Sequence, residues 1–275
     1  YYSRVGTAIE SSKTVITVYD MIHEKFPEHF SINDKTSKVK EESIARADHV
    51  IAISESTKAD LIEFFGTQPS KISVVYLGFG APAKNRESLG SVKSNDRDFL
   101  LYVGGRGGYK NFSGFIEAVA QSEKLISEID VVAFGGGAFT QVENAQFRVL
   151  GFKENQIRNV SGSDQLLSQY YSEAKAFIYP SLYEGFGIPP LEAMAHNCPV
   201  VSSNTSSMPE VIGDAAEYFS PTDVASISLA LENVIYSNTR IADLQKLGKE
   251  RIKKFTWERC AIETLKTYRT VLQDK

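Results

Sequence analysis

The stretch from residue 176 to residue 202 reads AFIYPSLYEGFGIPPLEAMAHNCPVVS and contains the pattern of a strand, a loop, a helix and a second strand. Ala176–Tyr179 and Pro199–Ser202 are short apolar runs typical of buried strands, whereas Pro189–His196 has a helical pattern. The prolines at its start suit the first turn of a helix. Short buried strands that alternate with helices predict a parallel sheet with right-handed crossovers.

The same alternation extends from this stretch along nearly the whole chain. Further strands are predicted at Val15–Tyr19, His49–Ile53, Ile72–Leu77, Phe99–Val103, Asp130–Phe134 and the short extended segment Phe147–Leu150. Further helices are predicted at Lys35–Arg46, from Ser54 or Ser56 through Phe65, and at Phe112–Ser122, Gln165–Glu173, Val224–Tyr236, Ile241–Phe255 and Trp257–Leu272. Asn85–Arg97 is polar and lacks periodicity, so we place a linker there. The prediction is an α/β protein with two doubly wound, Rossmann-like domains, residues 1–94 and 95–275, that face a cleft.

The composition of the 275 residues is that of an ordinary globular protein, with 42% hydrophobic and 23% charged residues. The net charge of −4 is spread over interspersed acidic and basic residues, which argues against a nucleic-acid-binding surface. Cys198 and Cys260 stand far apart and the four histidines lack metal spacing, so we expect reduced cytosolic cysteines and no metal site. No apolar run approaches the roughly 20 residues that span a bilayer. Peripheral association with a membrane stays compatible with this composition.

Three predicted strands of the second series end in loops with chemically suggestive residues, at the edge where open parallel sheets bind ligands. The first loop, Val103–Asn111, reads VGGRGGYKN. Its glycines let backbone N–H groups approach a ligand, and the planar fork of Arg106 and the compact charge of Lys110 suit a diphosphate. The alternative is a glycine-rich turn with two solvated cations. The spacing matches neither the dinucleotide fingerprint nor a P-loop.

The other two loops follow Phe134 and Tyr179. The triple-glycine segment Phe134–Phe139 is explained by tight turning without any ligand. After Tyr179, Glu184 lies in the loop near a helix start, and Glu192 lies about one turn into that helix. Two such carboxylates can accept hydrogen bonds from sugar or ribose hydroxyls. The alternative is a helix-start carboxylate favoured by the helix dipole and a solvated helical glutamate.

The segment Leu182–Gly213 reads LYEGFGIPPLEAMAHNCPVVSSNTSSMPEVIG and places two glutamates eight positions apart among glycines and prolines. This pattern resembles the retaining glycosyltransferases of family 4, which have two Rossmann-like domains in the GT-B architecture. The resemblance covers nearly the whole chain. It implies a retaining hexosyltransferase whose substrate is a nucleotide-sugar donor and which needs neither a metal nor another cofactor.

The resemblance also implies roles for the residues of the donor site. Arg106 and Lys110 would hold the donor diphosphate and stabilise the charge that develops as it leaves. Glu184 would face the donor sugar, and Glu192 would bind the ribose hydroxyls. The other implied donor-binding residues are Gly104 and Gly105 near the phosphates, the loop residues Gly185, Phe186 and Gly187, and Ile188 and Leu191 on the nucleotide side.

The N-terminal part resembles the same family through residues 17–27, TVYDMIHEKFP, where family members usually have a His-Asp pair. Tyr19 stands where the histidine is common, Asp20 is retained and His23 follows, so either Asp20 or His23 would face the cleft as a catalytic residue. The alternative for His23 is an exposed loop residue. The resemblance implies that the chain begins partway through an incomplete first domain. It also implies that the final helix, anchored by Trp257, returns to that domain.

The expected reaction moves a hexose, with retention, to a growing cell-surface polysaccharide or a lipid-linked glycan. Similar enzymes use GDP- or UDP-linked sugars, and we favour GDP-mannose. The expected location is the cytoplasm, including the inner face of the membrane. Two alternatives stay open: a sugar-nucleotide epimerase or phosphorylase on the same scaffold, and a nucleotide-sugar-binding module without turnover.

Overall fold

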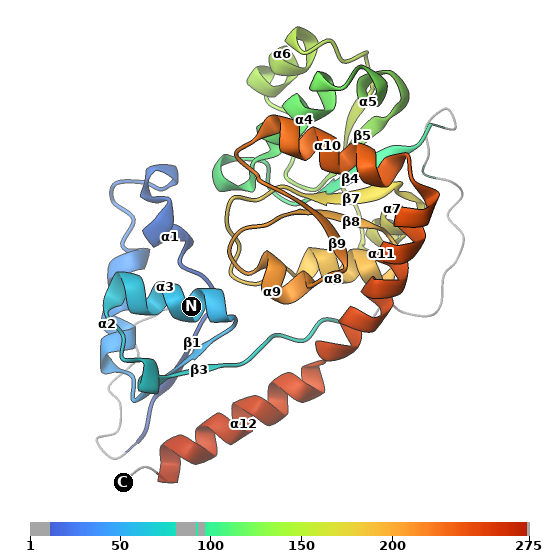
Figure 1. The fold of residues 1–275 in the computed structure, drawn as a ribbon. Helices are drawn as coiled ribbons and strands as arrows, with labels where there is room; N and C mark the ends of the chain where they lie inside the picture. Colours follow the sequence, from blue (N-terminus) through green and yellow to red (C-terminus); the bar gives the residue numbers. More distant parts are fainter. Residues whose placement is uncertain (1–11, 81–91, 93–96, 274–275) are drawn as a thin grey trace. The chain divides into compact units, whose positions relative to one another are not determined.

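The computed structural model describes residues 12–80, 92 and 97–273, and these form two compact units (Figure 1). The first unit contains residues 12–79, 183–186 and 255–273, and the second contains the rest. The linker predicted at Asn85–Arg97 lies outside the described residues except for Val92 and Arg97. Both units contain parallel strands and helices, so the predicted α/β fold class is confirmed.

The first unit contains a three-stranded parallel sheet in the order β1-β2-β3. Its strands are β1 (Val15–Val18), β2 (His49–Ala52) and β3 (Ile72–Val74), with Val15 opposite His49 and Val50 opposite Ile72. Its helices are α1 (Ile22–Lys25), α2 (Thr36–Arg46), α3 (Glu55–Phe65) and α12 (Trp257–Gln273), with 3-10 turns at Pro27–His29 and Pro69–Lys71. Its core consists of Val18, Met21, Ile44, Val50, Ala52, Leu61, Ile72 and Tyr183.

Helix α3 shows how local sequence sets the bounds of an element. Of the two serines considered as caps, Ser54 caps the helix, because its side chain accepts a 3.0 Å hydrogen bond from the N–H of Thr57. The helix ends at Gly66, whose φ of 59° is left-handed and therefore suits a glycine. These two ends fix the position of Ser54 and Thr57 at the start of α3.

The second unit contains a six-stranded parallel sheet in the order β6-β5-β4-β7-β8-β9. Its strands are β4 (Phe99–Val103), β5 (Asp130–Phe134), β6 (Ile157–Val160), β7 (Ala176–Tyr179), β8 (Val200–Ser203) and β9 (Ala216–Phe219). Its helices are α4 (Phe112–Gln121), α5 (Glu123–Glu128), α6 (Gln141–Val149), α7 (Asp164–Glu173), α8 (Ile188–Ala195), α9 (Met208–Ile212), α10 (Val224–Ile235) and α11 (Asn238–Arg251). The strand order reverses between β4 and β7, which is the arrangement of a doubly wound nucleotide-binding sheet.

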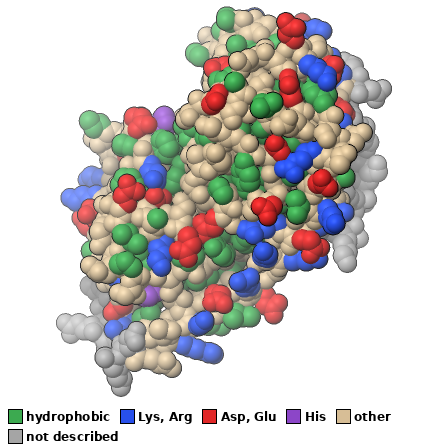
Figure 2. Space-filling model, viewed as in Figure 1, with side chains coloured by type: hydrophobic (Ala, Val, Ile, Leu, Met, Phe, Trp, Pro, Cys, Tyr) green, Lys and Arg blue, Asp and Glu red, His purple; other side chains and the backbone are tan. Residues whose placement is uncertain are grey.

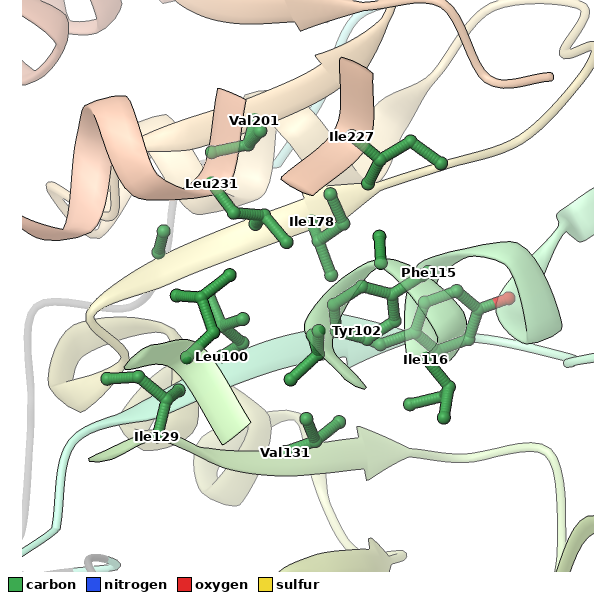
Figure 3. Packing of buried hydrophobic residues seen from close by; sticks show 14 of the residues in the cluster. Leu100, Tyr102, Phe115, Ile116, Ile129, Val131, Ile178, Val201, Ile227 and Leu231 are labelled. Carbon is green, nitrogen blue, oxygen red and sulfur yellow. The ribbon is translucent and has the colours of Figure 1, made fainter. Parts of the chain in front are cut away.

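Helices cover both faces of this sheet. On one face, Leu100 and Tyr102 of β4 and Ile178 of β7 pack with Phe115 of α4 and Leu231 of α10 in one buried cluster (Figure 3). On the other face, rings of α7 contact the sheet, with Tyr170 against Phe99 and Tyr171 against Phe177. Burial on both faces explains why the sequences of β4 and β7 are continuous apolar runs.

The predicted extended segment Phe147–Leu150 is wrong, because Phe147–Val149 form the end of α6 and Leu150 is its C-cap. Thr140 and Glu143 start this helix with reciprocal side-chain and backbone hydrogen bonds in a capping box. Phe147 is buried on the helix face that points to the core, where its ring contacts Phe139 at 5.0 Å between centroids. Ile157–Val160 supplies the edge strand β6 instead, and β9, α5 and α9 are further elements that the sequence did not predict.

The surface carries charges of both signs. On the face drawn in Figure 2, Lys and Arg side chains are interspersed with Asp and Glu side chains rather than gathered in one area. Within the described ranges, none of the helices combines the length and the hydropathy that crossing a bilayer requires.

Candidate functional site

The loops after β4 and β7 leave neighbouring strands at the point where the strand order of the second sheet reverses. The N–H of Leu182 donates a 2.7 Å hydrogen bond to the carbonyl of Tyr109 and so joins the two loops. The Asn111 side chain donates to the carbonyl of Pro180 at 3.1 Å and to that of Pro221 at 2.8 Å. Ligands of doubly wound sheets bind at this kind of strand-order reversal. The second unit therefore places the predicted phosphate loop where a nucleotide is expected.

Within the first of these loops, the backbone is shaped by glycines and a short 3-10 turn. Gly104 has a φ of 121°, and its N–H donates to the carbonyl of Phe134 at 2.9 Å. Gly105 accepts a hydrogen bond from the hydroxyl of Tyr102, and no atom lies within 4 Å of a Cβ built on Gly105. Lys110 ends the 3-10 turn Gly108–Lys110, and its Nζ lies 5.2 Å from the centre of the Tyr109 ring. The open space at Gly105 allows a ligand to approach the backbone.

Arg106 is held inside the second unit and its side chain is only 6% exposed. Its Nε donates to Glu143 at 2.6 Å, and Nη1 donates to the carbonyls of Gly135 at 3.2 Å and Gly137 at 2.9 Å. Nη2 donates to the carbonyl of Ala138 at 3.0 Å and to Glu143 at 3.5 Å. A guanidinium has five N–H donors, and all five are engaged within the protein. In this structure Arg106 therefore binds the second glycine-rich turn, whereas the resemblance implied that it binds a phosphate.

The contacts of Arg106 also account for the triple-glycine turn. A Cβ on Gly136, whose φ is +69°, would lie 2.7 Å from Nη1 of Arg106 and 2.7 Å from the carbonyl oxygen of Gly104. Burial tends to raise the pKa of Glu143, but hydrogen bonds from Arg106 and Thr140 outweigh it and hold that pKa below its usual range. The ion pair therefore stays charged and keeps the two glycine-rich turns together.

Glu192 lies on α8 and is half-buried, with its Oε2 accepting a 3.2 Å hydrogen bond from the hydroxyl of Tyr171. The pKa of Glu192 is raised, chiefly by burial. The hydrogen bond from Tyr171 lowers this pKa in part, and repulsion from Asp164 raises it further. The ring of His196 stacks on Tyr171, and its Nδ1 lies 2.7 Å from the carbonyl oxygen of Glu192. Glu192 is thus carried by a helix, and one of its carboxylate oxygens is fixed by the hydrogen bond from Tyr171. A group that binds hydroxyls needs such a fixed position.

Other residues predicted around Glu192 differ in their exposure. Leu191 is fully buried in the second unit, whereas Ile188, at the start of α8, is half-buried. Gly187 precedes the helix with a φ of 108°, which a side chain would strain. Of these residues, Ile188 is the apolar side chain that a nucleotide can contact without repacking the core.

Glu184, Gly185 and Phe186 fold with the first unit. Glu184 is buried, at 7% exposure. A Cβ built on Gly185 would lie 1.9 Å from the carbonyl oxygen of Tyr19 and 2.9 Å from Cβ of Asp20. Only a glycine allows so close an approach of two backbones. The structure thus brings predicted residues from two distant parts of the sequence, Asp20 and Gly185, into direct contact.

Asp20 and His23, the two candidates in the first unit, have different surroundings. Oδ1 of Asp20 accepts a 3.0 Å hydrogen bond from the N–H of Ile22. His23 stacks on Phe30 at 3.8 Å between ring centroids, and its Nε2 lies 3.7 Å from Asp34. Asp20 is therefore the candidate that lies beside the Glu184 loop, and the contacts of His23 are with residues of the following turn.

Comparison with protein-family models identifies the chain as a whole. Residues 84–253 match the model of the glycosyl transferases group 1, and residues 5–79 match the model of glycosyltransferase family 4. The chain belongs to the group 1 glycosyl transferases. The paired glutamates and the loop with Lys110 all fall within the matched residues.

Individual curated proteins are similar to the chain over most of its length. It is 28% identical to the O-antigen chain mannosyltransferase B of Escherichia coli over 83% of this chain and 62% of that protein. It is 30% identical to the O-antigen chain mannosyltransferase RfbU of Salmonella typhimurium over 80% of this chain and 60% of that protein. The chain thus spans about 60% of the length of these curated relatives.

A solved structure has the same fold. The crystal structure of Anabaena Alr3699/HepE in complex with UDP and glucose matches 95% of this chain and 72% of that chain, with a TM-score of 0.76 and 18% identity. The match confirms the Rossmann-like, GT-B type of fold for this group 1 glycosyl transferase.

Sequence reasoning missed Tyr183, Asp60 and Tyr171, which hold the paired glutamates or their neighbours. Tyr183 directly precedes Glu184, but its partner Asp60 lies 123 positions earlier, so no local pattern connects them. Tyr171 follows the apolar pattern of α7, which predicts a core residue rather than a partner of Glu192. Among the residues that the structure describes, no cluster of three or more His, Cys, Asp or Glu could hold a metal ion.

Proposed function

We propose that the chain transfers a hexose from a nucleotide-sugar donor to a glycan or lipid-linked acceptor in cell-surface polysaccharide synthesis. The transfer retains the anomeric configuration and needs no metal. Family membership supports the reaction class, and the two relatives that act in O-antigen synthesis support mannose as the sugar and a polysaccharide as the product. GDP-mannose is the donor that we favour, with UDP-linked hexoses as the alternative.

The observation that carries the proposal is the position of two loops at the strand-order reversal of the second sheet. The loop with Lys110 follows β4, and the loop that leads into α8 with Glu192 follows β7, the neighbouring strand. Hydrogen bonds from Leu182 to Tyr109 and from Asn111 to Pro180 hold the loops together. A cation and a carboxylate on two joined loops can bind the diphosphate and the ribose of one nucleotide.

The chemistry proposed for these groups is electrostatic. Lys110 and the backbone N–H groups of the glycine-rich loop stabilise the charge that develops on the leaving diphosphate. Glu192 accepts hydrogen bonds from ribose hydroxyls, and Glu184 does the same for the donor sugar. Arg106 contributes by holding the glycine-rich turns, and Asp20 is the first-unit residue that we favour for catalysis. The acceptor oxygen bonds to the anomeric carbon on the face from which the nucleoside diphosphate leaves as its own bond to that carbon breaks. The proton of the acceptor hydroxyl passes to the leaving diphosphate, and the configuration is retained.

Donor binding can be tested by thermal stabilisation of the full-length gene product with GDP, UDP and their sugars. A donor at one hundred times its Kd should stabilise the protein by about 2.7 kcal/mol. Lys110→Ala and Glu192→Gln should each weaken this stabilisation, and the exposed Lys153→Ala serves as the control for loss of one cation. Equal stabilisation of wild type and both site variants would contradict the assignment.

Turnover is tested separately by product analysis with the donor that stabilises the protein. Sugar transfer with retained configuration in the presence of a chelator supports the full proposal. Donor binding without transfer or hydrolysis would favour a binding module instead. A phosphate requirement or an epimerised donor would favour a phosphorylase or an epimerase. We place the reaction in the cytoplasm, at the inner face of the membrane when the acceptor is lipid-linked.

A further inference from the structure

Glu184 lies between two residues that are each held by hydrogen bonds within the first unit. Tyr183 precedes it and Gly185 follows it, and all three belong to the stretch of the chain that folds with this unit. The direction in which the Glu184 side chain leaves the backbone therefore depends on how these two neighbours are fixed. Each neighbour has its own set of partners.

The hydroxyl of Tyr183 is the first anchor. It donates a 2.7 Å hydrogen bond to Oδ2 of Asp60 and accepts one of 3.2 Å from the N–H of Met21. The other oxygen of Asp60 pairs with Nζ of Lys25 at 2.8 Å, and that Nζ also lies 5.4 Å from the centre of the Tyr183 ring. Burial, followed by the charge of Asp60, raises the pKa of Tyr183 far above its usual value. The phenol therefore stays protonated and donates at every working pH.

The carbonyl of Gly185 is the second anchor. It accepts hydrogen bonds from Oγ of Ser54 at 2.7 Å and from Oγ1 of Thr57 at 3.3 Å. Both hydroxyls lie at the capped start of α3, the same helix that carries Asp60. One helix thus holds Tyr183 through its side-chain hydroxyl and Gly185 through its backbone carbonyl, and the close approach of Gly185 to the carbonyl of Tyr19 limits a shift of the backbone in that direction.

We infer that Tyr183, Asp60 and Lys25 form a positioning network that sets the orientation of Glu184 toward the donor sugar. These three residues act through Glu184 and contribute no chemistry of their own. The inference rests on the proposed function, in which Glu184 contacts the sugar. A displacement of a catalytic group by about 1 Å can cost on the order of 100-fold in rate, so a network that fixes the backbone has a direct kinetic effect.

The test compares two tyrosine variants of the full-length gene product. Tyr183→Phe keeps the ring and removes the hydroxyl that binds Asp60. Tyr218→Phe is the matched control, because its hydroxyl donates a 2.6 Å hydrogen bond to the carbonyl of Gly213 in the second unit. Tyr183→Phe should lower kcat at least about tenfold with the donor KM within about threefold of wild type. The control should keep both constants although it also loses one partly buried hydrogen bond.

A second variant distinguishes a network from a single bond. Asp60→Asn should also lower kcat, and the double variant Tyr183→Phe/Asp60→Asn should lose much less than the product of the two separate losses. Residues that act as a unit are non-additive, whereas two independent structural defects multiply. Fully multiplicative losses in kcat would contradict the network.

Failure of this inference and failure of the proposed function give different results. If Tyr183→Phe loses stability as the control does but keeps wild-type kcat, the positioning role is overturned. If wild type transfers no sugar from any nucleotide sugar, the proposed function is overturned instead. Hydrogen–deuterium exchange of residues 184–187 then decides the inference, which requires about tenfold faster exchange in Tyr183→Phe than in wild type or Tyr218→Phe. Unchanged exchange would refute it.

Discussion

Nε of Arg106 donates a 2.6 Å hydrogen bond to Oε1 of Glu143, and this pair joins the loop after β4 to the first turn of α6. The rest of the guanidinium binds the carbonyls of the triple-glycine turn after β5. An arginine in a glycine-rich loop is usually interpreted as a ligand for phosphate. Here its hydrogen-bonding capacity is used by the protein, which leaves Lys110 as the cation of that loop to which we assign the diphosphate.

Replacement of Arg106 should therefore lower the stability of the fold, and any effect on donor binding should follow from that loss. Arg106→Ala removes a buried guanidinium that pairs with Glu143 and donates to the carbonyls of Gly135, Gly137 and Ala138, and we expect the free energy of unfolding to fall by about 1–3 kcal/mol. Urea unfolding measures this loss. Arg240→Ala is the matched control, because the more exposed Arg240–Glu217 pair should contribute less than about 1 kcal/mol. An Arg106→Ala protein of wild-type stability that no longer binds donor would support the phosphate role instead.

The triple-glycine turn gives a second prediction. Gly136→Ala forces a Cβ against Arg106 and the carbonyl of Gly104 at a left-handed φ, so we expect a loss of about 1–3 kcal/mol in unfolding free energy. Gly107→Ala in the neighbouring turn has open space and an ordinary φ of −84°, and it should be neutral or slightly stabilising. Thermal unfolding of the two variants side by side checks this, and equal destabilisation would show that the close approach is relaxed at little cost.

The raised pKa of Glu192 predicts a pH-dependent contribution to stability. The folded protein holds the Glu192 proton more tightly than the unfolded chain, whose glutamate pKa is about 4.3. Stability from this residue is therefore present at acidic pH and is lost as pH rises through the raised pKa. Glu192→Gln, which cannot ionise, should have a higher Tm than wild type near neutral pH and a similar Tm at acidic pH. The exposed Glu154→Gln controls for removal of one negative charge.

The start of α12 gives a prediction that a spectroscopic signal can follow. A Cβ on Gly78 would lie 2.2 Å from the backbone nitrogen of Trp257 and 2.5 Å from the carbonyl carbon of Thr256. Because backbone atoms cannot move aside cheaply, Gly78→Ala should destabilise the first unit by about 2 kcal/mol or more. Trp257 is the only tryptophan of the chain, so its fluorescence reports on this contact. Gly80→Ala, with open space around it, should leave both fluorescence and stability unchanged.

The fold was predictable where strands are buried on both faces. Phe99–Val103 and Ala176–Tyr179 are continuous apolar runs bounded by turn residues, and their predicted bounds agree with β4 and β7. Ile157–Val160 forms an edge strand that contains Arg158 and Asn159, so it lacks an apolar run and was missed. The segment from Phe147 is a strand in the prediction and a helix in the structure. Its one buried ring lies on a helix face, and a short apolar run does not distinguish the two.

The candidate site was predictable to the extent that it follows strand ends. Gly104, Lys110 and Glu192 come after β4 and β7 in the sequence, and a parallel sheet necessarily places such residues at one edge. The partners of those residues were not predictable. Arg106 binds carbonyls about 30 positions away, and Tyr183 binds Asp60 at a still larger separation. Contacts of this length depend on packing that local patterns do not contain.

Residues 183–186 fold with the first unit, although the residues on both sides of them in the chain fold with the second. This threading restricts how the gene can be recombined. A hybrid joined near residue 80 would take Asp60 from one parent and Tyr183 from the other, so donor and acceptor of one buried hydrogen bond would have separate ancestry. Exchange of the two halves between relatives keeps both partners of this bond from one parent when residues 183–186 travel with the N-terminal half. The first unit is therefore built from separate stretches of the sequence, and its boundaries differ from those that a cut in the linker would give.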